Sequence, residues 1–296
     1  MLNGATKVVG IMGGPHQVPL SLSPRIHNAA FRALGLDWVY VGFPVAEGSV
    51  AAAVRGLAVA GVRGFNVTMP HKMAVAACLD RLEGLAATVG AVNTVEIRGS
   101  GELVGWNTDG DGLLRFLRLD VGAEVKGTAA LVVGAGGAAR SAVAALARAG
   151  AGSVTVLARN RDRAEDLRGI ARGTEFRAAG LGSSDQRERE ASIVAASDLI
   201  VNATPVGQIA AVPSADAEDR PPIPVEAIRP GTVVVDMVYK PPVTRLVEEA
   251  RARGADAHGG LGMLLHQAAL AFEIWTGQDP PLEAMSAAAV SALSHS

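Results

Sequence analysis

Residues 131–140 read LVVGAGGAAR and decide the fold of one half of this chain. Apolar residues run up to Gly134, and an alanine-rich stretch over 138–149 follows the glycines. This order predicts a buried strand, a tight Gly-x-Gly-x-x-Ala turn and a helix. In such a turn Gly136 lets the backbone approach a pyrophosphate, and Ala139 lets the helix pack closely on the strand. The pattern indicates a dinucleotide site, although a purely structural glycine turn is the alternative interpretation.

The end of the next expected strand, 154–157, indicates which dinucleotide binds. A site for NAD places Asp or Glu there, which accepts hydrogen bonds from the ribose hydroxyls. This chain instead has Ala158, Arg159 and Asn160, with Arg163 one helical turn further on. Because guanidinium groups suit a 2′-phosphate, the sequence favours NADP over NAD. Two solvated arginines at a helix start are the alternative.

Short β-branched runs alternate with alanine-rich helical stretches on both sides of the glycine turn, which predicts an α/β fold with parallel sheets. Strands are expected at 7–11, 39–43, 64–67, 91–97, 129–133, 154–157, 198–201 and 233–236. Helices are expected at 24–34, 49–60, 111–119, 138–149, 263–275 and 282–293. Ser23 is expected to cap the first helix, with a proline at its first position. The segment 210–224 is expected to be an exposed loop.

The bulk composition limits the classes of function. The chain has 296 residues, 49% of them hydrophobic, which is enough for two domains. A net charge of −2 argues against nucleic-acid binding, and no apolar run is long enough for a membrane span. The N-terminus does not resemble a signal peptide, and Cys78 is the only cysteine. We therefore expect a cytoplasmic protein that acts on a small molecule and has no metal site.

Four polar clusters interrupt the first part of the chain, at 21–24, 66–72, 90–94 and 105–110. Each lies where a strand ends or a helix begins, the edge at which open α/β sheets bind ligands. Together they supply hydroxyls, amides, one ammonium and one carboxylate, a set suited to a small polyhydroxylated acid. Lys72 can donate a proton during ketone reduction while Asp109 orients it. Taken singly, Lys72 could be a solvated lysine, Asp109 a turn residue, and Ser21 or Ser23 a helix cap.

In this order the motifs resemble those of the shikimate dehydrogenase family. The matching segments are SLSP at 21–24, NVTMPHK at 66–72, GAVNT at 90–94, NTDG at 107–110, GAGGA at 134–138, NATPVG at 202–207, DMVYKP at 236–241 and GGLGML at 259–264. The resemblance covers about residues 8 to 277. It implies reversible reduction of 3-dehydroshikimate to shikimate by NADPH.

The resemblance also implies roles for individual residues. Ser21 and Ser23 would bind the substrate carboxylate, and Lys72 and Asp109 would form the catalytic pair. The ring hydroxyls would be held by Thr68, Asn93, Asp109 and Gln267, with Tyr239 closing the pocket. The NADP contacts would be Gly134, Ala135, Gly136, Gly137 and Ala138 at the pyrophosphate, Arg159, Asn160 and Arg163 at the 2′-phosphate, and Thr204, Met237 and Gly260 near the rest of the cofactor.

The resemblance implies two domains. The substrate domain would comprise 1–108 and 260–296, with a Rossmann-type NADP domain, 109–259, inserted between these parts. Serine at both Ser21 and Ser23 favours shikimate over quinate, although a quinate/shikimate or aminoshikimate dehydrogenase of a specialised pathway is an alternative. A second alternative, a non-catalytic homologue that senses the ligand, is disfavoured because Lys72 and Asp109 are both present. The sequence leaves open whether the protein forms a homodimer.

Overall fold

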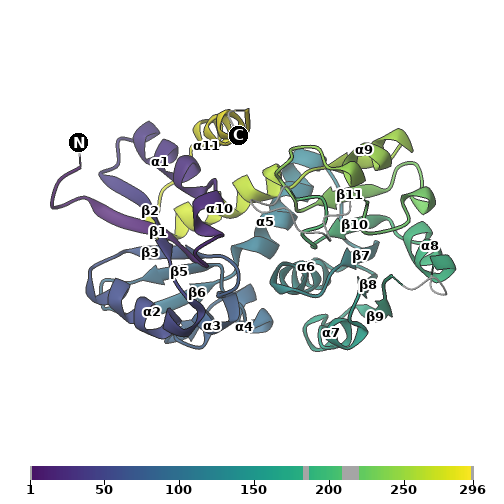
Figure 1. Cartoon of the computed structure of the whole chain (residues 1–296), viewed down its shortest axis with the longest axis horizontal. Coiled ribbons are helices and arrows are strands. Elements are labelled where there is room, and N and C mark those ends of the chain that lie inside the picture. Colours follow the sequence, from purple (N-terminus) through teal and green to yellow (C-terminus); the bar gives the residue numbers. More distant parts are fainter. Residues whose placement is uncertain (1, 183–186, 209–219, 295–296) are drawn as a thin grey trace. The chain divides into compact units, whose positions relative to one another are not determined.

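The computed structural model describes residues 2–182, 187–208 and 220–294. The chain divides into two compact units, Met1–Gly112 with Leu265–Ser296, and Leu113–Leu264 (Figure 1). Both divisions fall inside helices, within α5 (Thr108–Phe116) and α10 (Leu261–Thr276). The α/β fold with an inserted second unit is therefore confirmed.

The first unit contains a six-stranded mixed sheet. Its order is β2-β1-β3-β5-β6-β4, formed by Trp38–Pro44, Lys7–Gly13, Gly64–Val67, Thr94–Ile97, Leu103–Trp106 and Arg81–Leu82. The expectation of an all-parallel sheet is wrong here, because β5 runs antiparallel to both β3 and β6. The reason is the short connection between β5 and β6, since a parallel pair needs a crossover of about a dozen residues or more. Residues 91–93 precede β5 and form no strand.

The helices of the first unit are α1 (Ser23–Ala33), α2 (Val50–Val59), α3 (Lys72–Ala76), α4 (Leu85–Val89), α11 (Leu282–Ser294) and parts of α5 and α10. The expectation that Ser23 caps α1 is wrong. Helix α1 begins at Ser23 itself, with Leu22 at the N-cap and no capping side chain. The chain turns earlier than expected because the Ser21 hydroxyl oxygen accepts a hydrogen bond from the Ser23 N–H, at 3.2 Å.

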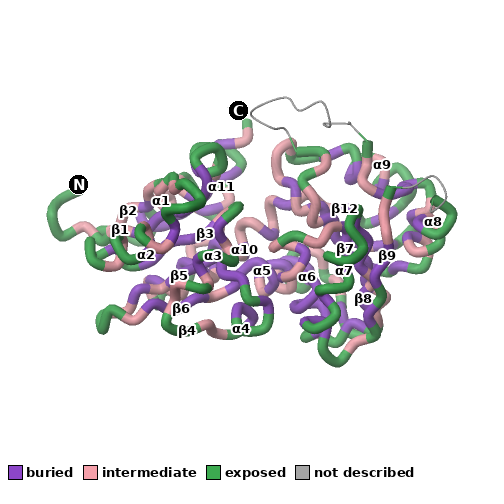
Figure 2. Tube along the Cα trace, turned by 60° about the horizontal axis from the view of Figure 1, so that its bottom comes forward, coloured by how far each residue is buried: buried purple, intermediate pink, exposed green. Residues whose placement is uncertain are grey.

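Helix α10 is anchored to the sheet of the first unit by Trp275. The Trp275 Nε1–H donates to the carbonyl of Val95 in β5, at 2.9 Å. Gly64 in β3 makes this contact possible, since a Cβ there would lie 2.3 Å from Trp275 Nε1. The central strands are buried in both units (Figure 2). A long helix near the end of the chain is therefore held against strands from its beginning.

The second unit contains a six-stranded parallel sheet. Its order is β12-β11-β10-β7-β8-β9, formed by Asp256–His258, Val233–Asp236, Leu199–Asn202, Ala129–Val133, Ser153–Ala158 and Glu175–Gly180. The helices are α6 (Gly137–Arg148), α7 (Arg161–Glu165), α8 (Arg187–Ala195) and α9 (Arg245–Ala252). The order of strands reverses beside β7, which is the switch point where doubly wound sheets bind ligands.

Two further expectations need correction, one about α5 and one about the expected loop at 210–224. Helix α5 begins at Thr108 rather than 111 and ends in one π-helical turn, Leu117–Val121, before Gly122. Of the expected loop 210–224, residues 210–219 lie outside the described residues. The described remainder is partly buried rather than exposed, because the apolar side chain of Ile223 joins the core around Leu246. No helix in the described ranges is long and apolar enough to cross a membrane.

His27 gives the first unit a predictable pH dependence. Its fully buried ring stacks on Tyr40 with centroids 4.6 Å apart, and burial lowers the pKa of His27 from 6.5 to about 3. Between those two values the unfolded chain binds a proton that the folded chain does not. The free energy of unfolding should therefore fall as the pH drops below 6.5 toward 3, by up to about 1.4 kcal/mol per pH unit from this group.

Urea unfolding of the wild type and of His27→Gln at a series of pH values measures this contribution. Glutamine does not titrate, so the variant should lose stability less steeply with acidification than the wild type. Parallel pH profiles for the two proteins would contradict the assignment to His27.

Candidate active site

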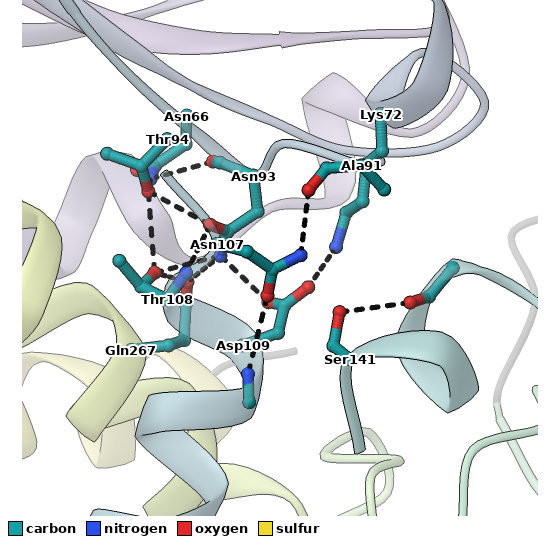
Figure 3. A network of polar contacts seen from close by, with 12 residues as sticks. Asn66, Lys72, Ala91, Asn93, Thr94, Asn107, Thr108, Asp109, Ser141 and Gln267 are labelled. Atoms are coloured by element: carbon teal, nitrogen blue, oxygen red, sulfur yellow. Dashed lines mark hydrogen bonds and ion pairs between the residues drawn. The ribbon is translucent and has the colours of Figure 1, made fainter. Parts of the chain in front are cut away.

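An ion pair between Lys72 and Asp109 lies at the centre of the polar region of the first unit (Figure 3). Lys72 is the first residue of α3, shortly after β3, and Asp109 lies in the first turn of α5, after β6. The Lys72 Nζ is 2.5 Å from Asp109 Oδ2, and the two side chains are only 18% and 12% exposed. A charge-assisted bond of this kind holds an ammonium in a defined direction while leaving it accessible.

Asn93 holds the other carboxylate oxygen. Its Nδ2 donates to Asp109 Oδ1 at 2.9 Å and lies 2.8 Å from Thr108 Oγ1. Its Oδ1 accepts from the Thr108 backbone N–H at 2.7 Å, which satisfies a donor at the start of α5. Asn93 is therefore itself fixed by the helix that carries Asp109, and it is almost completely buried.

Gln267 reaches this cluster from α10. Its Oε1 lies 3.2 Å from Asn93 Nδ2 and 3.5 Å from Thr108 Oγ1. Gly112 allows the approach, because a Cβ there would lie 2.8 Å from the Gln267 backbone nitrogen. The absence of a side chain at one position of α5 thus brings together groups far apart in the sequence.

Three residues that sequence reasoning quoted in motifs, but gave no role, support Asn93. Asn66 Nδ2 donates to the Asn93 carbonyl at 3.2 Å and to Thr94 Oγ1 at 3.0 Å. Thr94 Oγ1 in turn lies 3.2 Å from Asn93 Oδ1, and Thr108 completes the group. The sequence signal for these three residues was that they lie in the same motifs as the predicted site residues. Tyr40, which donates to Asn66 Oδ1 at 2.7 Å, stands alone in an apolar strand and had no such signal.

Three more expected substrate contacts lie in the first unit. Ser21 follows a short 3-10 turn, and Ser23 begins α1. Thr68 follows β3, and its backbone N–H donates to the Met12 carbonyl at 2.9 Å. Its methyl group packs on Gly13 of β1, where a Cβ would lie 2.3 Å away. Thr68 thus lies at the carboxyl ends of the parallel strands β1 and β3.

In the second unit the glycine turn follows β7 as expected. Gly134 has φ +108°, which favours glycine, and Gly136 stands at the N-cap of α6 with no side chain capping the helix. A Cβ at Gly136 would meet no atom within 4 Å, so packing within the protein does not require glycine there. Open space in front of a twelve-residue helix N-terminus fits a pyrophosphate.

Arg159, Asn160 and Arg163 lie together after β8 and are exposed. No ion pair within the described residues engages either arginine, and β8 ends at Ala158 without an acid. Asn160 has a further role that the sequence did not reveal, since its side chain caps α7 by accepting from the Arg163 N–H at 3.0 Å. Two uncompensated guanidinium groups at this strand end fit a 2′-phosphate.

Asn202 brings the remaining expected cofactor contacts together. Its side chain accepts from the Thr204 N–H and hydroxyl, at 3.0 and 2.7 Å, and its carbonyl accepts from the Met237 N–H at 3.0 Å. Gly260 packs against Met237, whose carbonyl oxygen would lie 2.3 Å from an added Cβ.

Tyr239, the residue expected to close the substrate pocket, follows β11, and burial raises the pKa of its phenol.

Asp236 supports this arrangement and was not predicted as a functional residue. It accepts hydrogen bonds from Asn202 Nδ2 at 2.9 Å, the Val238 N–H at 3.1 Å and the Thr244 hydroxyl at 2.6 Å. Burial raises the pKa of this carboxyl group, and the three donors oppose the rise. Asp236 thereby ties the ends of β10 and β11 to the start of α9.

Comparisons with known proteins find similar families along most of the chain. Family models match the chain over 11–95 (shikimate dehydrogenase substrate binding domain), 118–216 (shikimate / quinate 5-dehydrogenase) and 260–290 (shikimate 5'-dehydrogenase C-terminal domain). A shikimate dehydrogenase (NADP(+)) of Citrifermentans bemidjiense is 49% identical over 284 residues, which cover 95% of this chain and 93% of that protein.

Solved structures are similar over the same length. A shikimate dehydrogenase in complex with NADP+ is 37% identical, with a TM-score of 0.86 and coverage of 99% of this chain and 98% of that one. The shikimate 5-dehydrogenase of Thermus thermophilus, in complex with NADP(H) and shikimate, is 36% identical, with a TM-score of 0.81 and coverage of 97% and 100%. With nearly half of its residues identical to a relative along almost the whole length of both, this chain belongs to the shikimate dehydrogenase family.

Proposed function

We propose that this protein catalyses the reversible, NADPH-dependent reduction of 3-dehydroshikimate to shikimate. The observation that carries the proposal is the Lys72–Asp109 pair, whose carboxylate is held by Asn93, which in turn contacts Gln267. Ketone reduction needs a positioned proton donor beside the carbonyl oxygen, and this pair supplies one. The first unit would be the substrate domain and the second the NADP domain.

The substrate would be held by groups at its two ends. Ser21 and Ser23 would bind the carboxylate, while Thr68, Asn93, Asp109 and Gln267 would hold the ring hydroxyls. During reduction the Lys72 ammonium stabilises the negative charge that develops on the carbonyl oxygen and donates a proton to it. Asp109 keeps the ammonium directed and accepts a hydrogen bond from the substrate. In the reverse direction Lys72 takes the proton from the substrate hydroxyl.

NADPH, when bound, supplies the hydride. The backbone of 134–138 and the N-terminus of α6 would hold its pyrophosphate, and Arg159 and Arg163, with Asn160, its 2′-phosphate. Thr204, Met237 and Gly260 would contact the remainder, and Tyr239 would close the substrate pocket.

Purified protein with shikimate and NADP tests the proposal by the ultraviolet absorbance of NADPH. We expect NADPH to form with shikimate and NADP, and little reduced cofactor to form when quinate replaces shikimate or when NAD replaces NADP. Quinate turnover equal to that with shikimate would favour the alternative of a quinate/shikimate dehydrogenase, and turnover of aminoshikimate would favour its specialised counterpart. Ligand binding by calorimetry without any turnover would instead favour a non-catalytic sensor.

Replacement of Arg159 tests the choice of cofactor. Arg159→Gln should raise the KM for NADP by about 10- to 100-fold, the value of a hydrogen bond to a charged group, with little change in the KM for NAD. The matched control is Arg172→Gln, another exposed arginine of the second unit, which should change neither constant. Equal effects of Arg159→Gln on both cofactors would contradict a role at the 2′-phosphate.

We further propose a cytoplasmic location, supported by the single Cys78, which leaves no intramolecular disulfide to form. A homodimer stays a prediction that sedimentation velocity would test.

A further inference from the structure

His71 is a buried histidine that the proposed reaction does not use. It comes directly before Lys72 in the 66–72 cluster, and only 1% of its surface is exposed. Its Nε2 lies 2.8 Å from the carbonyl oxygen of Val45, the residue that follows β2. Because a carbonyl can only accept, Nε2 carries the proton and His71 is the donor. The His71 side chain therefore ties the chain before Lys72 to the end of a different strand.

The residue that accepts this hydrogen bond is itself fixed. The Val45 N–H donates to the carbonyl of Gly13, the last residue of β1, at 2.8 Å. The Val45 side chain packs against the hydrophobic core of the first unit. The His71 ring is thus bound to a part of the chain that belongs to the sheet, which makes Val45 a firm anchor.

Backbone hydrogen bonds hold the rest of the segment that carries Lys72. The Met69 carbonyl accepts from the Gly14 N–H, and the Lys72 carbonyl accepts from the Val92 N–H, both at 3.0 Å. These bonds join backbone atoms, so a substitution does not remove them. The bond from His71 comes from a side chain, and its contribution can therefore be measured by substitution.

Helix α3 needs such an anchor because it has only five residues, Lys72–Ala76. A helix of this length makes too few backbone hydrogen bonds to be stable alone. No side chain caps its start, where His71 occupies the N-cap position. Since Lys72 is the first residue of α3, the place where the helix begins determines where the ammonium meets Asp109.

We propose that His71 is a positioning residue for Lys72, which ties the start of α3 to the end of β2 and thereby directs the ammonium at the reacting carbonyl oxygen. This inference rests on the proposed function. His71 acts through Lys72, so its loss should impair the chemical step more than the binding of shikimate.

Two replacements of equal length separate the hydrogen bond from the space that the side chain fills. The glutamine amide nitrogen stands as many bonds from Cβ as Nε2 does in histidine, so His71→Gln keeps a donor for Val45, whereas His71→Met has none. We expect His71→Met to lower kcat for shikimate oxidation by about 10- to 100-fold, the cost of a misplaced catalytic group, with the KM for shikimate within about twofold of the wild type. His71→Gln should keep kcat within about twofold of the wild type.

The matched control is Ser197→Ala in the second unit. It also removes a hydrogen bond from a buried side chain to a carbonyl, that of Ile193 at 2.8 Å. We expect it to lower the free energy of unfolding and to leave kcat and the KM for shikimate unchanged. The control therefore shows whether lost stability alone changes the kinetics.

A double-mutant cycle with Lys72→Met distinguishes positioning from general damage. If His71 acts through Lys72, His71→Met should not lower kcat further in the Lys72→Met background. If His71→Met does not fold, His71→Asn replaces it, because the asparagine amide nitrogen is one bond too short to take the place of Nε2. We expect His71→Asn to lower kcat as His71→Met would.

Three results would overturn the positioning role alone. The first is a wild-type kcat in His71→Met or His71→Asn, and the second is an equal loss of kcat in His71→Gln and His71→Met. The third is a further loss of kcat when His71→Met is added to Lys72→Met. A wild-type protein that does not turn over shikimate would instead overturn the proposed function, and this inference with it.

Discussion

Lys72→Met is expected to lower kcat with shikimate and NADP by about 10²- to 10⁴-fold, the usual contribution of a general acid–base. Methionine has a similar length and fills the same space without a proton to donate. The chemical step should therefore slow in both directions, because proton transfer and stabilisation of the oxygen charge are lost together. The KM for NADP should change little, since the expected cofactor contacts lie elsewhere in the chain.

Steady-state kinetics of both directions, with unfolding curves to confirm the fold, measure this effect. The matched control is Lys126→Met, an exposed lysine of the second unit, for which kcat should equal that of the wild type. A kcat of Lys72→Met close to the wild-type value would remove Lys72 from the reaction.

Two replacements of Asp109 should impair the protein to different extents. Asp109→Asn keeps an acceptor for Asn93 but removes the negative charge from beside Lys72, and kcat/KM should fall by about 10²- to 10³-fold. Asp109→Ala also leaves the Asn93 amide without a partner at that position and the Lys72 ammonium unpaired. Asp109→Ala should therefore lower the free energy of unfolding by roughly 1–3 kcal/mol more than Asp109→Asn does.

Comparison of the two variants separates charge from hydrogen bonding, with kcat/KM for shikimate and urea unfolding as the measurements. Asp111→Asn, which changes an acid in the same turn of α5, is the control and should keep wild-type kinetics. If Asp109→Asn were as active as Asp111→Asn, the carboxylate would have no catalytic role.

The fold was predictable where the pattern of residues is local. The glycine turn and the strand before it lie where the sequence places them, because the turn requires glycine at Gly134 and the strand is uniformly apolar. The antiparallel direction of β5 was not predicted, because periodicity reports a strand but not its direction, and β6 was not among the expected strands. The cap at Ser23 was wrong because the helix begins one residue earlier than expected: the Ser23 N–H donates to the Ser21 hydroxyl oxygen, and the Arg25 and Ile26 N–H groups donate to the Leu22 carbonyl.

The candidate site was predictable only as a set of motifs. Lys72, Asp109, Asn93 and Gln267 do meet, but their approach depends on the missing side chain at Gly112, which no local pattern indicates. The support from Tyr40 and Asp236 depends on which buried strands become neighbours. Such residues are recognised only when every buried donor and acceptor is followed to its partner.

The proposed function requires that hydride passes from NADPH to the carbonyl carbon of 3-dehydroshikimate on this protein. The most direct test is mass spectrometry of the shikimate formed from 3-dehydroshikimate and NADPH that carries deuterium at both C4 positions of its nicotinamide. We expect shikimate that carries deuterium on the reduced carbon, in an amount equal to the NADPH consumed, and at most about a hundredth of that product with Lys72→Met over the same time. Consumption of NADPH without deuterated shikimate, or no reaction at all, would contradict it.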